Sequence, residues 1–202
     1  MKKKKAPLFF AGIDYGSKTA GTTVIAFPDE NDLVHFAGSP VKGNADRFIR
    51  DWCAQHHPGR LYIDAPLSLP GVYRWPEQYG DYFYRKADRS VSAMSPMFLG
   101  GLTARAMKLS AELNELNIET KEVYPSRLAA ELGFDKKQYK KVKKYLYPLS
   151  RQLCSQLPFA TDPASVIDWH HFDALLALFS GWRHQNEHHL LFGEGEEGYI
   201  IV

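Results

Sequence analysis

Blocks of apolar residues separated by short polar segments fill the first third of the chain, and they predict strands. Residues 8–13 form an apolar run, rich in aromatic and branched side chains, that indicates a buried strand. Similar runs follow at 21–27 and 33–37, and the polar residues 28–32 between them predict a hairpin turn. Three short strands joined by tight turns predict an antiparallel meander.

Helix and strand patterns alternate after the meander. Apolar residues at helical spacing predict an amphipathic helix over 45–56, with Asn44 as its N-cap. Residues 60–64 predict a fourth strand. A strand that follows a helical crossover most simply lies parallel to the first strand, with a right-handed connection. The first and fourth strands are therefore expected to end at the same edge of the sheet.

Residues 71–98 interrupt this regular pattern and predict an insertion or lid over the strand ends. The segment has two prolines, little periodicity, and aromatic side chains interleaved with cationic ones. Such a mixture can stack bases, at about 1–3 kcal/mol per base, and hold phosphates. In the alternative interpretation, the aromatic side chains only pack the insertion onto the body.

The remainder of the chain predicts further helices and strands. The expected elements are a helix over 102–116, a strand over 118–124, a helix over 128–132, a basic and aromatic segment over 139–147, a helix over 149–157, a turn at 193–195 and a terminal strand over 199–202. A longer helix begins after Asp168, and its apolar face comprises Phe172, Leu175, Leu176, Phe179 and Trp182. Together these patterns predict an α/β fold whose five-stranded mixed sheet is flanked by helices, in one domain over 1–202.

Composition adds little to this picture beyond the classes of protein that it excludes. At 45% hydrophobic and 24% charged residues, the chain is typical of a globular protein. Lys2 to Lys5 resemble the start of a signal peptide, but the apolar stretch after them is short and is broken by Asp14. Cys53 and Cys154 are too few and too far apart for a disulfide framework. We therefore expect a cytoplasmic protein without a membrane partner.

Charge is informative in its distribution and not in its total, since the net charge is only +2. Lysines cluster at 2–5 and 136–144, whereas 187–197 is acidic. Basic clusters can attract phosphates, although ordinary solvated lysine faces have the same sequence pattern.

Acidic residues at the ends of two predicted strands suggest chemistry. Asp14 and Asp64 each follow an apolar run that ends in isoleucine. Two carboxylates at the ends of neighbouring parallel strands repel each other unless a cation lies between them. Asp173 lies among apolar residues in the last helix, and His170 precedes it by three positions, on the same helix face. The alternatives are a turn cap for Asp14, an arginine partner for Asp173 and a surface position for His170.

Taken together, these residues favour a metal site. Mg²⁺ and Mn²⁺ take carboxylate oxygens, and two such ions about 3.5–4 Å apart can activate a water and stabilise the leaving oxygen of a phosphodiester. We predict Asp14, Asp64, His170 and Asp173 as metal ligands, with the three aspartates as catalytic residues. Glu122 is an additional candidate acid; alternatively, it is a strand residue paired with a lysine.

The order of elements resembles the ribonuclease H-like fold. Asp14, within Gly12-Ile13-Asp14-Tyr15-Gly16, looks like the first-strand aspartate of that superfamily, and residues 170–175 are similar to the last-helix motif of RuvC-type Holliday-junction resolvases. A closer resemblance is to the family called domain of unknown function 429, predicted ribonuclease H-like nucleases. The blocks that carry it are residues 63–70, Arg85 to Arg89, Glu122-Val123-Tyr124-Pro125-Ser126, Tyr139-Lys140, Asp173-Ala174-Leu175-Leu176 and Glu197-Gly198-Tyr199-Ile200. The chain departs from the family pattern at His170, where an acid is common, and at Tyr199, where tryptophan is common.

This resemblance implies a nuclease that requires Mg²⁺ or Mn²⁺ and binds nucleic acid. Candidate substrate-binding residues are Lys18, Arg85, Asp88, Arg89, Arg127 and Lys140. One rival is a phosphotransferase of the actin-like group, because residues 14–18 resemble the phosphate loop of those ATPases; such proteins need two domains. Another rival is a non-catalytic nucleic-acid-binding scaffold. The choice between DNA, RNA and a hybrid stays open, as does the oligomeric state, with a homodimer among the options.

Overall fold

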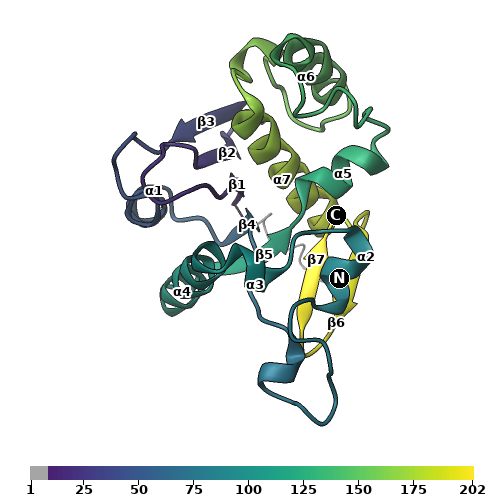
Figure 1. The fold of residues 1–202 in the computed structure, drawn as a ribbon. Helices are drawn as coiled ribbons and strands as arrows, with labels where there is room; N and C mark the ends of the chain where they lie inside the picture. The colour runs from purple at the N-terminus through teal and green to yellow at the C-terminus, as the bar shows by residue number, and fades with distance from the viewer. Residues whose placement is uncertain (1–8) are drawn as a thin grey trace, which may run out of the picture.

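The fold is built on a mixed sheet of seven strands, shown in Figure 1 by a computed structural model that describes residues 9–202. The strand order is β3-β2-β1-β4-β5-β7-β6. The strands are β1 (Phe10–Asp14), β2 (Val24–Pro28), β3 (Val34–Gly38), β4 (Arg60–Asp64), β5 (Glu119–Val123), β6 (Leu191–Glu194) and β7 (Gly198–Ile201). The predicted α/β class and mixed sheet are confirmed. Leu8 and the lysines at 2–5 lie outside the described residues.

The terminal strand predicted over 199–202 is confirmed as β7, but the prediction of a five-stranded sheet is wrong because the C-terminal hairpin adds both β6 and β7 to the sheet. Residues 193 and 194, predicted in a turn, belong to β6, and the turn follows them. The hairpin joins the main sheet through β7, which pairs in parallel with β5.

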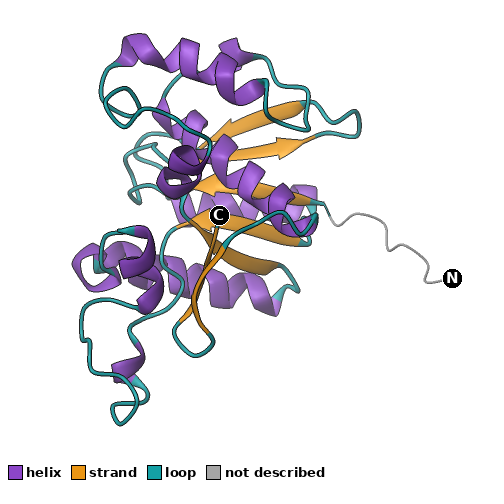
Figure 2. Ribbon diagram, turned by 90° about the vertical axis from the view of Figure 1, so that its right-hand side faces the viewer, coloured by secondary structure: helices purple, strands orange, loops and turns teal. Residues whose placement is uncertain are grey.

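Helices cover both faces of the sheet (Figure 2). The α-helices are α1 (Ala45–His56), α2 (Lys86–Val91), α3 (Pro96–Leu99), α4 (Gly101–Glu115), α5 (Pro125–Glu131), α6 (Leu146–Cys154) and α7 (Trp169–Gln185); the 3-10 helices are η1 (Gly71–Tyr73), η2 (Lys143–Tyr145) and η3 (Pro163–Ser165). Two helices start three residues before their predicted start: α5 begins at Pro125, which is favoured in the first helical turn, and α6 begins at Leu146. None of the described helices has the length and apolar character needed to cross a membrane.

Side-chain alternation along the central strands divides the core into two halves. Ala11 and Ile13 of β1 belong to the half that includes residues of α1 and α4. Phe10 belongs to the other half, which includes the buried face of α7. This alternation is the two-residue period of a strand buried on both sides.

The register of the central strands places two acids side by side. β1 is antiparallel to β2 and parallel to β4, which is in turn parallel to β5. In the β1–β4 pairing, Asp14 lies opposite Asp64. The predicted parallel pairing of the first and fourth strands is thus confirmed, and both strands end at one edge of the sheet.

Glycines allow α7 to pack directly on the central strands. A Cβ atom at Gly12 of β1 would lie 2.0 Å from the backbone nitrogen of Leu178 in α7. A Cβ atom at Gly181 would lie 2.4 Å from Cδ2 of Tyr62 in β4. The helix backbone therefore lies closer to the sheet than any larger side chain permits, and this close packing fixes the position of the helix against β1.

The segment predicted as a lid covers the strand ends only with its second half. Its first half, including η1, extends away from the body beyond the β6–β7 hairpin (Figure 1). The Glu197 carboxylate holds it there, accepting hydrogen bonds from the backbone N–H groups of Gly71 at 2.7 Å and Lys86 at 2.8 Å. The exposed aromatic side chains of the segment are Tyr73, Tyr82, Phe83 and Phe98. For these four, the interpretation that they pack the insertion onto the body is wrong.

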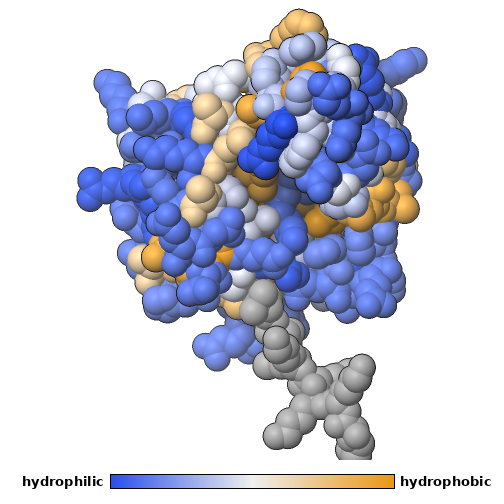
Figure 3. Space-filling view, turned by 90° about the horizontal axis from the view of Figure 1, so that it is seen from below, coloured by the Kyte–Doolittle hydropathy of each residue, from blue (hydrophilic) through white to orange (hydrophobic). Residues whose placement is uncertain are grey.

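Hydrophobic side chains on the surface form separate patches. Viewed from below, the molecule is covered mostly by hydrophilic residues, with hydrophobic patches between them (Figure 3). Isolated apolar residues on a surface are ordinary for globular proteins, so these patches by themselves indicate no partner.

Candidate metal centre

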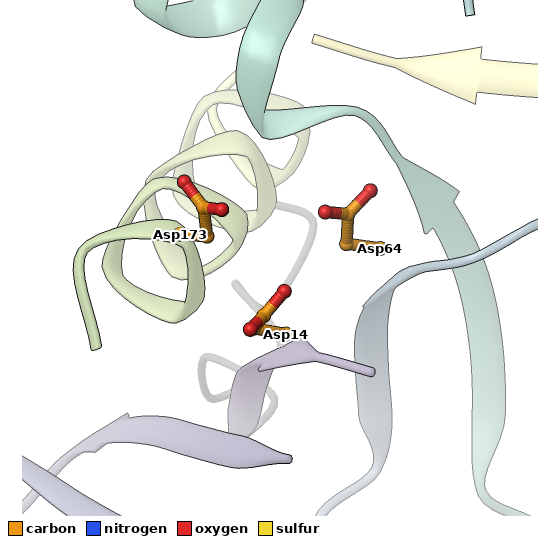
Figure 4. Close-up of side chains that lie close together, drawn as sticks. All are labelled: Asp14, Asp64 and Asp173. Atoms are coloured by element: carbon orange, nitrogen blue, oxygen red, sulfur yellow. The ribbon is translucent and has the colours of Figure 1, made fainter. Parts of the chain in front are cut away.

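Three aspartates from distant parts of the chain converge at the edge of the sheet (Figure 4). Asp14 is the last residue of β1, Asp64 is the last residue of β4, and Asp173 lies in the second turn of α7. One carboxylate oxygen from each lies within 4.8 Å of the others. The convergence follows from the β1–β4 register and from the close packing of α7 on Gly12.

Asp173 is buried and has a partner on each carboxylate oxygen. The Tyr139 hydroxyl donates a hydrogen bond to Oδ1, and the Lys140 ammonium pairs with Oδ2. Both partners lie at the start of the basic and aromatic segment over 139–147, before η2. Lys140 has a φ of 59°, in the left-handed region that few residues other than glycine adopt. Lys140 therefore has an unfavourable backbone conformation at the position from which its ammonium pairs with the buried Asp173 carboxylate.

His170 contacts Asp14 and not Asp173, the acid three positions after it in α7. Its Nδ1 lies 2.7 Å from Oδ2 of Asp14, and this hydrogen bond raises the pKa of the imidazole. The three-residue cluster of potential metal ligands does not include His170. In this arrangement the histidine is a partner of the Asp14 carboxylate, and its predicted role as a direct ligand stays a prediction.

The acidic cluster carries more negative charge than its surroundings neutralise. Burial raises the pKa of Asp64, and the nearby charges of Asp14 and Asp173 raise it further. Burial also raises the pKa of Asp173 to about 6, against the opposing effect of Lys140. Among the described residues, no hydrogen-bond donor meets the Asp64 carboxylate. A cation at this position would relieve the repulsion.

The donor set fits a hard divalent cation. Carboxylate oxygens are the ligands that Mg²⁺ and Mn²⁺ prefer, and one or two carboxylates with water suffice for Mg²⁺. Each of the three aspartates provides one oxygen, and these oxygens lie close enough together for one ion to bind all three. The cluster therefore fits the metal that the sequence predicts.

Glu122, Arg85 and Asp88 form a separate buried network instead of joining the three aspartates. Arg85 donates to both oxygens of Glu122, at 2.7 and 2.6 Å, and to both oxygens of Asp88, at 3.1 and 2.6 Å. The Leu67 backbone N–H donates to Glu122 at 2.9 Å. The exposures of Arg85, Asp88 and Glu122 are 0%, 1% and 7%.

This network corrects the roles predicted for its three members. Glu122 has a cationic partner, as the alternative interpretation expected, but the partner is an arginine and not a lysine. Because Arg85 bonds both oxygens of each carboxylate, neither Glu122 nor Asp88 is free as a catalytic acid. Arg85 and Asp88 are too buried to contact a substrate phosphate directly.

The other predicted substrate-binding residues lie on the surface. Arg89 pairs with Asp81 at 2.9 Å, and Arg127 pairs with Glu131 while its guanidinium lies over the Phe192 ring. Lys18 is exposed in the turn after β1. Within residues 9–202, none of these three contacts the acidic cluster. Lys140 alone among the predicted cations does.

Two site features were not predicted from the sequence. Tyr139 donates to Asp173, whereas the sequence marked it as part of a basic and aromatic segment and of one block of the family resemblance, without a partner. The turn after β1 is held by Arg105, which pairs with Asp46 at 2.6 Å and donates to the Gly16 carbonyl at 3.3 Å. An arginine in the second turn of an amphipathic helix is the only sequence signal for this second feature.

No protein-family model matches the chain, and a search of curated proteins finds no match.

Proposed function

We propose that the protein is a metal-dependent nuclease with a ribonuclease H-like fold that hydrolyses phosphodiester bonds in nucleic acid. The observation that carries this proposal is the convergence of Asp14, Asp64 and Asp173 at the carboxyl edge of β1 and β4. The order β3-β2-β1-β4-β5, antiparallel and then parallel, supports the fold assignment, and the β6–β7 hairpin extends it.

The three aspartates would hold Mg²⁺ or Mn²⁺. A bound divalent ion supplies an activated water near neutral pH and neutralises charge on the phosphodiester oxygens. The packing of α7 on β1 orients Asp173 before any ligand arrives, and preorganised charges of this kind need no reorganisation during the reaction. His170, through Nδ1, fixes the orientation of the Asp14 carboxylate.

Lys140 would bind the substrate phosphate. Its ammonium pairs with Asp173, and a divalent ion held by that carboxylate would leave the lysine available for an anionic partner. The other lysines of the 136–144 cluster, at 136, 137, 141, 143 and 144, are exposed and add positive charge to the surface. Such a surface attracts a phosphate backbone without reading its sequence.

Cleavage assays test the proposal. Labelled single-stranded, duplex, hybrid and branched oligonucleotides are incubated with the protein and Mg²⁺ or Mn²⁺, with EDTA as the metal-free control. We expect metal-dependent cleavage of at least one substrate, abolished by Asp14→Asn and retained by Asp51→Asn, which changes an exposed acid of α1. Metal-dependent ATP hydrolysis without nucleic-acid cleavage would contradict the proposal and favour the phosphotransferase. Binding without either activity would favour the scaffold.

A further inference from the structure

A pocket lies directly beside the acidic cluster and is not needed to hold a metal. Its volume is about 210 Å³, and its lining includes residues of α3, β5 and β7, elements that are labelled in Figure 1. Asp64 is part of its lining, so the pocket borders the candidate metal centre. At about 30 Å³ per water molecule, this volume corresponds to roughly seven waters, which suits one planar heterocycle but not a stacked pair.

The walls of the pocket are mostly apolar. Met94, Leu99 and Leu102 line the side formed by α3 and its flanking residues, and Tyr124 lines the side formed by β5. Flat aromatic ligands bind between side chains of this kind because stacking and burial stabilise them regardless of hydrogen bonding. The apolar walls therefore favour a ring over a phosphate or a sugar.

The charged groups in the lining are all acidic. Asp64, Asp88 and Glu122 line the pocket, and none of the lining residues is Lys, Arg or His. Arg85 neutralises part of the charge of Asp88 and Glu122 from behind, since it is fully buried and bonded to both. A ligand that enters the pocket meets hydrogen-bond acceptors and no cation, so the lining disfavours an anionic ring and favours a ring that presents donors.

We propose that this pocket binds an unpaired nucleobase next to the phosphate to be cleaved, with guanine preferred. The choice of a nucleic-acid ligand rests on the proposed nuclease function. Guanine presents adjacent donors at N1 and at the N2 amino group, which suit carboxylate acceptors. Adenine and cytosine present one donor beside an acceptor, and uracil presents its donor between two carbonyl acceptors, so a carboxylate repels part of each edge.

Nucleosides bound to the metal-free protein test the pocket separately from catalysis. Guanosine and inosine are titrated in EDTA and followed by ligand-observed NMR, because inosine differs from guanosine only in lacking the N2 amino group. We expect guanosine to bind about tenfold more tightly, the effect of one hydrogen bond to a charged group. Equal affinities would overturn the preference for a donor edge, and the absence of binding by any nucleoside would overturn the pocket as a base site.

Paired variants locate the binding. Leu99→Ala removes part of the apolar wall, whereas Phe98→Ala changes the neighbouring residue of α3, which is 63% exposed and does not line the pocket. We expect the first variant to weaken guanosine binding about fivefold or more and the second to leave it unchanged. Unchanged thermal unfolding of both variants shows that α3 stays folded. Equal loss in the two variants would place the nucleoside outside the pocket.

The nuclease and pocket proposals fail in different assays. Cleavage that depends on Asp14 together with equal binding of guanosine and inosine would remove the base pocket and leave the nuclease. Selective guanosine binding without any cleavage would remove the nuclease and leave a guanine-binding site.

Discussion

Asp14 and Asp64 are direct partners across the parallel pairing of β1 and β4, each as the last residue of its strand. Neighbouring strands in a sheet lie about 4.8 Å apart, so backbone hydrogen bonds keep the two carboxyl groups close whatever their charge. The protein therefore holds two like charges together by its core and not by its loops. Such an arrangement is unfavourable without a counter-ion, and this cost is the physical basis of the predictions on metal binding.

Replacing the Asp64 carboxylate by an amide should weaken metal binding without destabilising the fold. We expect Asp64→Asn to weaken Mg²⁺ binding about 100-fold or more, the upper end of the losses known for residues around metal ligands. The metal-free melting temperature should not fall, because the amide removes a charge that Asp14 and Asp173 repel. Thermal unfolding with and without Mg²⁺ measures both effects. The matched control Asp51→Asn should keep the full metal response, and a lower metal-free melting temperature for Asp64→Asn alone would contradict the repulsion.

Metal affinity should rise with pH. Folding raises the pKa of Asp173 from 3.8 to about 6, so the folded metal-free protein binds protons more tightly than the unfolded chain. The contribution of this group to stability is therefore present at low pH and is lost as the pH rises through about 6. Mg²⁺ must displace the proton, so its affinity increases over the same range. Calorimetric titration at about pH 5 and about pH 8 measures the difference; equal affinities would contradict it.

Lys140 should stabilise the metal-free protein more than neighbouring lysines do. We expect Lys140→Met to lower the free energy of unfolding in EDTA by about 1–2 kcal/mol, below the cost of breaking a fully buried pair because its side chain is 40% exposed. Lys141→Met, at an exposed position, serves as the control. Urea unfolding measures both variants. Saturating Mg²⁺ should reduce the loss of stability caused by Lys140→Met, since the ion then neutralises Asp173 in place of the lysine. A loss of stability that is the same with and without Mg²⁺ would argue that the ion and Lys140 do not share Asp173.

The contact of α7 with β1 should tolerate no side chain at residue 12. We expect Gly12→Ala to cost about 3 kcal/mol or more, because the new Cβ would lie 2.0 Å from a backbone nitrogen and the helix would have to move. Gly38→Ala, at the end of β3, is the matched control, since a Cβ there meets nothing within 4 Å. Urea unfolding compares the two. Similar stabilities would show that α7 can shift without cost.

Arg85, which is fully buried, should contribute to the stability of the fold and not to substrate contact. We expect Arg85→Lys to lower the free energy of unfolding by about 3–5 kcal/mol, because lysine cannot bond both carboxylates with the planar fork of a guanidinium. Arg89→Lys is the control, with a side chain that is 62% exposed and an expected effect within about 0.5 kcal/mol. Chemical denaturation measures both. A folded Arg85→Lys protein of normal stability that binds nucleic acid poorly would restore the original prediction of substrate contact.

The sequence predicts the centre of the fold better than its edges, for physical reasons. The runs before Asp14 and Asp64 are buried on both faces, and apart from Arg60 at the start of β4 they contain no charged residue, so the strand pattern is strong. β6 is different: Leu191 is 51% exposed, and Gly193 has a φ of 116° that resembles a turn residue. Its strand conformation comes from pairing with β7, which no pattern within the segment indicates.

Side-chain partners are predictable only where the backbone dictates them. The proximity of Asp14 and Asp64 follows from strand order, which the sequence indicates. The burial of Arg85 depends on Glu122, 37 positions away, and a cation in an aromatic segment has the same sequence pattern whether it faces solvent or a buried acid. Likewise, Tyr139 reaches Asp173 only because of the conformation of the loop around Lys140.

The hydrogen bond between His170 and Asp14 spans 156 positions of the chain, so the acidic cluster joins the first strand of the sheet to its last helix. During synthesis on the ribosome, β1 emerges long before α7. Closing so large a loop comes late in folding, after more local contacts have formed. A nascent chain therefore cannot complete the acidic cluster until α7 has been made, and the metal site that we propose would form only late in folding.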